Sequence, residues 1–220
     1  MEKVNYDNIA KDFSQSRKNM KWEEIEYFLE KYEEEINGKT ILDVWCGSGR
    51  LLEHFIENLD DLDIDYYGVD ASSGMIEEAK KNFWFADFFV LDMTRLDDFS
   101  KKNIESVFFI ASFHHLQTFE ERVMTLQNLK KILVPNSYVF LTNWALDSEV
   151  NREKYEKNIL PNSQNKWGWR DYSIKFGEYE RFYHWFSLQE LENIFIQAWF
   201  EIVENRLFDT GKNFISIIKN

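Results

Sequence analysis

The sequence predicts an α/β fold in which a mostly parallel β-sheet carries helices on both faces. Three observations lead to this fold class. From residue 40 onward, short apolar runs alternate with amphipathic segments of roughly ten to fifteen residues. A glycine turn follows the first apolar run, and the last two runs are joined by a link too short for a helical crossover. The chain has 220 residues, of which 44% are hydrophobic, and we expect residues 1–220 to form a single domain.

A helix is predicted over about residues 20–36, ahead of the first strand. Apolar residues recur there at helical spacing from Trp22 onward, and the Asn37-Gly38 pair is a helix stop. Residues 5–18 also place apolar side chains at helical spacing, which favours a short amphipathic segment. We therefore expect residues 1–38 to form an N-terminal helical cap.

Five strands and their crossover helices follow in order. The fourth strand is a continuous apolar run, typical of a strand that is buried on both faces. Ser72 or Ser73 can cap the helix after the second strand, which carries Met75. The predicted strands cover residues 40–44, 65–70, 85–91, 104–110 and 137–142, and the predicted helices include residues 49–59 and 119–133.

The alternation stops after Trp144. Residues 147–183 are polar and aromatic without a sustained period, so residues 145–184 are interpreted as an insertion or lid. The short link between the last two strands predicts a hairpin, which makes the final strand antiparallel. The elements predicted beyond the insertion are a helix over residues 187–198 and strands over residues 201–206 and 214–219.

The stretch from Asp43 to Gly49 gives the first chemical signal. It joins a strand to a helix start, and this geometry brings bare backbone N–H groups close to a nucleotide-like ligand. Asp70 ends the next strand about twenty residues further on, where a ribose hydroxyl would need an acceptor. Trp45 stands where such a turn wants its first glycine.

Composition narrows the functional classes. The formal net charge of −13 argues against a broad electrostatic grip on nucleic acid, although it leaves room for a local basic patch. The apolar runs are far shorter than a membrane span, and the N-terminus lacks an apolar signal region. Cys46 is the one cysteine, so an intrachain disulfide is excluded and a cytoplasmic location is expected. The chain holds 8 glycines, where average usage would give roughly fifteen.

The ordered set of motifs resembles that of class I S-adenosylmethionine (SAM)-dependent methyltransferases. The set comprises the glycine turn, an acid after the second strand, Asp92 after the third and the final hairpin. The resemblance implies a Rossmann-like seven-stranded sheet in the order 3-2-1-4-5-7-6, with SAM lying across the carboxyl ends of its strands and S-adenosylhomocysteine as product. The cofactor-binding residues that it implies are Tyr6, Arg17, Asp43, Trp45, Gly47, Gly49, Asp70, Ala71, Met75, Asp92, Met93, Ala111 and Ser112.

The roles within this set follow from the same resemblance. It places Asp43, Gly47 and Gly49 at the methionine part of SAM. It places Asp70 at the ribose hydroxyls, and Asp92 with Met93 at the adenine. Ala111 and Ser112 would close the pocket.

Three separated segments show a closer resemblance, to the Trm9/ALKBH8-type tRNA wobble-uridine carboxyl methyltransferases. They are YDNIAKDFSQSR at residues 6–17, FHHL at residues 113–116 and RFYHWF at residues 181–186. That family esterifies the carboxylate of 5-carboxymethyluridine at the tRNA wobble position, often with a small activating partner protein. The resemblance therefore implies tRNA as the acceptor and a possible activator protein as a partner.

A carboxylate acceptor would need a clamp rather than a base. Its pKa near 4 leaves it ionised at neutral pH, so the site has to supply positioning and a cationic or hydrogen-bonding partner. The candidates are Arg181, His184 and His114 as catalytic residues, with Arg17 as a further cation. If the acceptor were an amine or a phenol, His114 would be the candidate base. No Cys, His or acid cluster has metal-ligand spacing around these residues, so no metal is expected.

Purely structural roles also remain open for these candidate residues. The pair His114-His115 could be a satisfied pair below the pocket, Arg181 and His184 could simply close an aromatic lid, and Arg17 could pair with a surface acid. The charge of −13 favours a small-molecule O- or N-methyltransferase on the same scaffold as the alternative function.

Trp45 keeps a third function in view, that of a non-catalytic SAM-fold binding module. Trp199 also occupies a place where the family usually has glycine, between the last helix and its strand. One hypothesis joins the two tryptophans to the shortage of glycine: the source reads the codon UGA as glycine.

Overall fold

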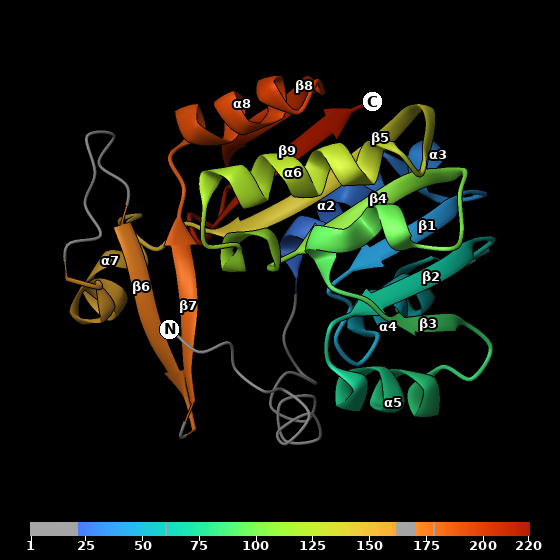
Figure 1. Cartoon of the computed structure of the whole chain (residues 1–220), viewed down its shortest axis with the longest axis horizontal. Coiled ribbons are helices and arrows are strands. Elements are labelled where there is room, and N and C mark those ends of the chain that lie inside the picture. Colours follow the sequence, from blue (N-terminus) through green and yellow to red (C-terminus); the bar gives the residue numbers. More distant parts are fainter. Residues whose placement is uncertain (1–21, 60, 162–169, 178) are drawn as a thin grey trace.

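The computed structural model describes residues 22–59, 61–161, 170–177 and 179–220. Its centre is a seven-stranded sheet in the order β3-β2-β1-β4-β5-β9-β8 (Figure 1). Strands β1 to β5 are parallel, and β9 runs antiparallel to both β5 and β8. The strands are β1 (Thr40–Val44), β2 (Asp65–Asp70), β3 (Asp87–Val90), β4 (Ile104–Ile110), β5 (Leu133–Trp144), β8 (Glu201–Leu207) and β9 (Asn213–Lys219).

The predicted topology is confirmed. Counted within this sheet alone, the strand order is 3-2-1-4-5-7-6, and the last strand is the antiparallel one. The short link through Gly211 leaves no room for a helix, so β8 and β9 pair directly as a hairpin.

Helices cover both faces of the sheet. Alternate residues of a strand point to opposite faces, and β1 shows the result: Leu42 packs with the helices on one face and Ile41 with those on the other. In Figure 1, α6 lies across β4 and β5, with α2 on the far side of the sheet. One face carries α6 (Phe119–Lys130), α8 (Leu188–Gln197) and the 3₁₀ helix η2 (Met93–Asp98), and the other carries α2 (Glu23–Lys31), α3 (Glu33–Ile36), α4 (Arg50–Asn58) and α5 (Ser73–Asn82).

The helix predicted over residues 20–36 is divided in two, so its expected continuity was wrong. Tyr32 leaves the helical conformation at φ −125°, between α2 and α3. Its ring is buried, and its hydroxyl donates to Glu204 on β8 at 3.0 Å. This tertiary contact accompanies a break that helical periodicity does not reveal. The segment 5–18 lies outside the described residues.

The insertion contains a second, two-stranded antiparallel sheet that the sequence analysis missed. It is formed by β6 (Arg170–Phe176) and β7 (Tyr179–Trp185), and it is preceded by α7 (Arg152–Tyr155) and the 3₁₀ helix η4 (Glu156–Asn158). Polar side chains at inward positions hide the alternation of these strands, because Arg181 and His184 of β7 are both buried. Figure 1 shows the β6–β7 hairpin beside the edge at which the parallel strands end.

The helices of the described ranges are too short or too polar to cross a membrane.

Candidate active site

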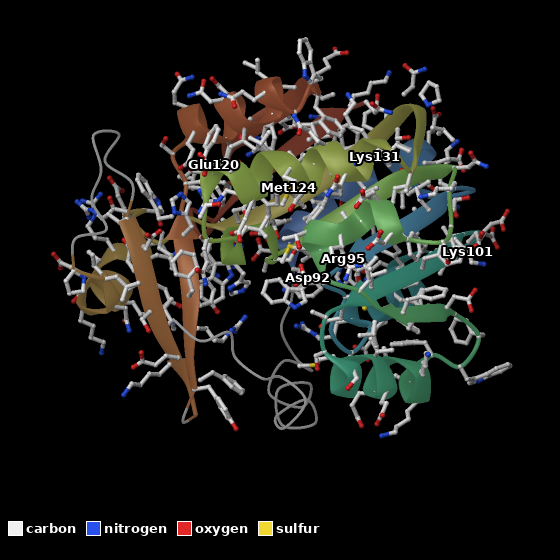
Figure 2. The ribbon with its side chains drawn as sticks, viewed as in Figure 1. Asp92, Arg95, Lys101, Glu120, Met124 and Lys131 are labelled. Atoms are coloured by element: carbon white, nitrogen blue, oxygen red, sulfur yellow. The ribbon has the colours of Figure 1, made fainter. Side chains whose placement is uncertain are left out.

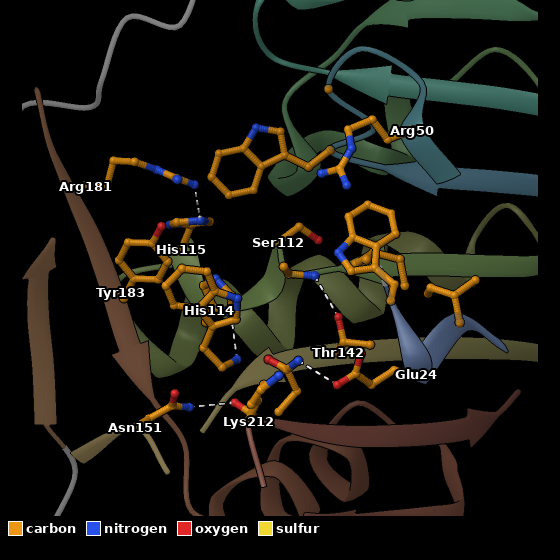
Figure 3. Close-up of a pocket in the computed structure, with 18 of the residues that line it drawn as sticks. Glu24, Arg50, Ser112, His114, His115, Thr142, Asn151, Arg181, Tyr183 and Lys212 are labelled. Atoms are coloured by element: carbon orange, nitrogen blue, oxygen red, sulfur yellow. Dashed lines mark hydrogen bonds between the residues drawn. The ribbon is translucent and has the colours of Figure 1, made fainter. Parts of the chain in front are cut away.

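A cavity of about 520 Å³ opens at the carboxyl edge of the sheet. Its walls come from the glycine turn after β1, the ends of β4 and β5, the start of α2, β7 and the β8–β9 turn (Figure 3). This is the edge at which open α/β sheets bind ligands. The predicted site residues that line it are Trp45, Gly47, Asp70, Met75, Ala111, Ser112, His114 and Arg181.

The glycine turn is tied to the end of β2. The N–H groups of Trp45 and Cys46 donate to the carbonyl of Val69, and the N–H of Gly47 donates to the Asp70 carboxylate at 3.0 Å. Gly49 begins α4 at φ +84°, and a Cβ atom there would lie 2.7 Å from the Phe83 ring. Gly49 thus lets α4 start close to the loop after α5, but it does not line the cavity itself.

Asp70 is the buried carboxylate that faces the cavity. Its second oxygen accepts from the N–H of Ser72 at 2.8 Å, and its side chain is among the cavity walls. A carboxylate has about four lone-pair sites, so a group of this kind can accept ligand hydroxyls beside backbone donors. The position predicted for a ribose acceptor therefore holds a group of the right chemistry.

Asp43 lies beneath the turn rather than in the cavity. It is buried and accepts a hydrogen bond from the Tyr66 hydroxyl at 2.6 Å. Burial raises the pKa of the Asp43 carboxyl to about 7, and the nearby Asp70 adds to the rise, while the Tyr66 hydrogen bond opposes it. Its contact with a ligand stays a prediction, whereas its contact with Tyr66 fixes β1 against β2.

The end of β4 turns sharply into the cavity. Ala111 has φ +50°, and its N–H donates to both the carbonyl and the hydroxyl of Thr142 on β5. Ser112 follows with its side chain buried in the cavity wall, and its Oγ has no hydrogen-bond partner among the described residues. A buried hydroxyl without a partner is costly, so this position suits a polar ligand atom.

His114 is a neutral donor by its surroundings. The N–H of Trp144 donates to His114 Nδ1 at 3.4 Å, which leaves the proton on Nε2. Burial pulls the pKa of His114 well below its usual value, and the charge of Arg181 adds to this effect. The side chain of the neighbouring Asn143 opposes this shift, but neither that side chain nor His114 Nε2 has a well-formed hydrogen bond among the described residues. His114 Nε2 is itself buried, although the residue lines the cavity.

Arg181 is held in the cavity by a histidine that the sequence analysis did not select. His115 Nδ1 lies 2.6 Å from the carbonyl of Phe182 and must donate to it, so Nε2 accepts from Arg181 Nη2 at 3.0 Å. Figure 3 shows the Arg181 guanidinium pointing at the His115 ring. The signal for His115 was its place in the FHHL segment, directly beside the histidine that was chosen.

His184 is not among the residues that line the cavity, so the cavity lining does not support its predicted catalytic role. Its Nδ1 lies 2.6 Å from Asp171 on β6, and its Nε2 lies 3.0 Å from both carboxylate oxygens of Glu190 on α8. Glu190 also pairs with Arg122 on α6 at 3.2 Å, in full burial. His184 therefore belongs to a buried polar network, Asp171–His184–Glu190–Arg122, that joins the β6–β7 hairpin to the main sheet.

The remaining predicted residues fall elsewhere. Asp92 caps η2 by accepting from the N–H and hydroxyl of Thr94, and Figure 2 shows it near the carboxyl edge of the sheet. Met93 packs on the core, and Ala71 is exposed. None of these three lines the cavity, and Tyr6 and Arg17 lie outside the described residues. Their contacts with adenine, ribose or acceptor stay predictions.

Sequence reasoning also missed cations at the cavity mouth. Arg50, Lys154 and Lys212 line the cavity from three segments that are far apart in the chain. Single lysines and arginines carry no local pattern, so only the fold brings them together.

The cavity residues fit SAM with one exception. Asp70 can accept ribose hydroxyls, Ser112 offers a buried hydroxyl, and the volume is within the 300–1,000 Å³ typical of small-molecule sites. The exception is Trp45, whose indole lines the same cavity and stacks edge-on against His115 at 4.4 Å. No group of three or more His, Cys, Asp or Glu in the described part of the chain is arranged to hold a metal ion.

Comparison with known proteins gives one family and several relatives. The family described as "Methyltransferase domain" matches residues 14–205. The tRNA (carboxymethyluridine(34)-5-O)-methyltransferase ALKBH8 of Macaca fascicularis is 28% identical over 74% of this chain, and that of Xenopus tropicalis is 30% identical over 69%. The matched regions make up only 22% of each of those proteins.

Solved structures share the fold. A SAM-dependent methyltransferase from Methanosarcina mazei superimposes with a TM-score of 0.67 at 20% identity, covering 86% of this chain and 96% of its own. A Haloferax volcanii methyltransferase, solved in complex with the Trm112 methyltransferase activator, superimposes with a TM-score of 0.67 at 16% identity, covering 98% of this chain and 95% of its own.

Proposed function

This chain belongs to the methyltransferase domain family, and on that premise we propose that it transfers the methyl group of SAM to a carboxylate oxygen. The observation that carries the proposal is Arg181. Its guanidinium is fixed by His115 in the same cavity that the glycine turn and Asp70 line. A guanidinium is suited to hold a carboxylate, because its planar fork matches the two oxygens.

The side chains suit an acceptor that is already ionised. SAM, when bound, supplies an electrophilic methyl group. Asp70 would accept hydrogen bonds from the ribose hydroxyls of SAM, and Gly47 and Met75 would flank the cofactor. His114 carries its proton on Nε2 and is neutral, so this nitrogen cannot accept a proton from an acceptor. A carboxylate needs no base, and the fixed cation of Arg181 suits it.

We further propose that the carboxylate belongs to 5-carboxymethyluridine at the wobble position of tRNA. The ALKBH8 relatives are named as tRNA (carboxymethyluridine(34)-5-O)-methyltransferases, which supports this acceptor. Lys154 and Lys212 are exposed at the cavity wall, where they could meet phosphates. A small activator protein is part of the same proposal. It would add basic surface to a chain whose net charge is −13.

The same charge supports a second candidate, a small-molecule acceptor. A protein of net charge −13 repels polyanions at long range, whereas a free metabolite carboxylate would be held by Arg181 alone. The two candidates share the bond that is formed and differ in what carries the carboxylate.

A labelling experiment tests both levels of the proposal. Methyl-labelled SAM is incubated with the protein and either bulk tRNA or a metabolite extract, and the product is then treated with mild alkali. A methyl ester releases its label as methanol, whereas ethers and N-methyl groups keep it. We expect alkali-labile label in the tRNA fraction. Alkali-labile label in the metabolite fraction would support the second candidate, a small-molecule acceptor, in place of tRNA. Alkali-stable label would refute a carboxylate acceptor.

A further inference from the structure

Trp45 and Trp199 adopt backbone conformations that favour glycine. Their φ angles are +66° and +63°, in the left-handed region, where a β-carbon collides with the following carbonyl. The other non-glycine residues with positive φ in the described ranges are Asn103, Ala111 and Asn136. Asparagine is the residue best tolerated there after glycine, and alanine is small. The presence of two tryptophans among the residues with positive φ therefore needs an explanation.

Trp199 occupies the glycine position of a Schellman motif. Helix α8 ends at Gln197 with Ala198 as its C-cap, and the N–H of Phe200 donates to the carbonyl of Phe195 while the N–H of Trp199 donates to that of Ile196. These two bonds define the motif, and the residue between them is usually glycine. The Trp199 side chain is 80% exposed, so its packing does little to offset the strain of the backbone conformation.

Trp45 repeats the pattern at the cavity. Residues 45, 47 and 49 all have positive φ, at +66°, +57° and +84°, and the last two are glycine. The alternation marks residue 45 as the first glycine position of the turn. With tryptophan there, an indole lies in the cavity against His115, beside the Arg181 that His115 holds.

The anomaly does not extend to the other described tryptophans. Trp22, Trp84, Trp144 and Trp185 lie outside the positive-φ region. We propose that the protein made in its source carries glycine at positions 45 and 199, because UGA specifies glycine there, and that a tryptophan at position 45 obstructs the cofactor cavity. The second half of this proposal rests on the proposed function, and the first half does not.

The first test reads the gene and the protein directly. We expect UGA codons at positions 45 and 199, and peptides from the natural source whose masses correspond to glycine at both. Ordinary UGG codons at these positions, or natural peptides that contain tryptophan, would overturn the proposal. These readouts involve neither SAM nor an acceptor, so a failure of methyl transfer leaves them unchanged.

The second test uses variants of the protein that carries tryptophan at positions 45 and 199. Trp199→Gly should raise the melting temperature by roughly 2–4 °C, the shift expected for relief of one left-handed residue in a chain of this size. Trp84→Gly is the matched control, since Trp84 is 85% exposed without a positive φ, and it should give no rise. Equal melting of Trp199→Gly and the parent would contradict the backbone argument.

Calorimetry completes the test at the cavity. Trp45→Gly should tighten binding of SAM and of S-adenosylhomocysteine by about tenfold or more relative to the parent, while Trp84→Gly leaves it unchanged. Equal affinity in Trp45→Gly and the parent would overturn the claim that Trp45 obstructs the cavity.

Discussion

At the residue scale, the acceptor side of the site depends on one histidine tautomer. The Phe182 carbonyl forces the proton of His115 onto Nδ1, and this leaves Nε2 free to accept from Arg181. Arg181 is thereby held by a neutral acceptor. The sequence analysis chose Arg181 as a clamp, and the residue that positions it became visible only in the fold.

Removal of the guanidinium should separate acceptor binding from cofactor binding. We expect Arg181→Ala to lower kcat/KM for a carboxylate acceptor by about tenfold to a hundredfold, the typical loss for a hydrogen bond to a charged group. The affinity for SAM in calorimetry should stay nearly constant. Arg170→Ala is the control, because Arg170 lies on the same hairpin but pairs with Asp147 outside the cavity. Unchanged turnover in Arg181→Ala would refute the clamp.

Asp43 should give the protein a pH-dependent stability. Its pKa is about 7 in the fold against 3.8 ordinarily, so the folded state holds a proton that the unfolded state has lost. This contribution is full below about pH 4 and disappears as the pH rises through 7. The melting temperature should therefore fall between pH 5 and pH 8 by more in the parent than in Asp43→Asn, whose amide keeps an acceptor for Tyr66. The exposed Asp61→Asn should melt like the parent, and identical pH profiles for all three would contradict the assignment.

At the element scale, the β6–β7 hairpin is attached to the main sheet by a polar network that is largely buried. Asp171, His184, Glu190 and Arg122 come from β6, β7, α8 and α6, and the Arg122 guanidinium also donates to the carbonyl of Leu116 just after the histidine pair. The network thus connects the hairpin that carries Arg181 with the segment that carries His115. Its geometry explains why His184 is buried without contacting the cavity.

Breaking this network should be costly. Glu190→Gln removes the carboxylate that faces both His184 and Arg122, and loss of one partner of a buried pair typically costs 3–5 kcal/mol. We expect the free energy of unfolding in urea to fall by about 3 kcal/mol or more. Glu192→Gln on the same helix is the control and should change it by less than about 0.5 kcal/mol. A loss for Glu190→Gln no larger than the control's would show that the network does not hold the hairpin.

At the scale of the whole molecule, the distribution of charge decides what can approach the cavity. The chain has a net charge of −13, yet one cavity is lined by four cations beside three acids, namely Arg50, Lys154, Arg181 and Lys212 beside Glu23, Glu24 and Asp70. A polyanion would gain from these local contacts and lose to the field of the remaining surface. Large acceptors should therefore be sensitive to the exposed cations, and small ones should not.

Substitution of the exposed Lys154 and Lys212 tests this difference between large and small acceptors. Lys154→Ala combined with Lys212→Ala should weaken methyl transfer to tRNA several-fold at moderate salt, with little change for a free carboxymethyl nucleoside. Lys101→Ala is the control, because Figure 2 shows Lys101 on the side of the molecule away from the β6–β7 hairpin. An equal loss on both acceptors would indicate that the lysines act on the cavity itself rather than on phosphates.

The sequence by itself determined the sheet, the turn and the anomaly within it. The strand positions, the final hairpin and the acid after β2 follow from hydrophobic periodicity and turn chemistry, which are local properties of the chain, whereas the strand order was implied by the family resemblance. The tertiary structure alone decided that His115 rather than His184 meets Arg181, that Tyr32 divides the first helix, and that a second small sheet stands by the cavity. Each of these depends on which side chains from distant segments meet, and no local pattern records that.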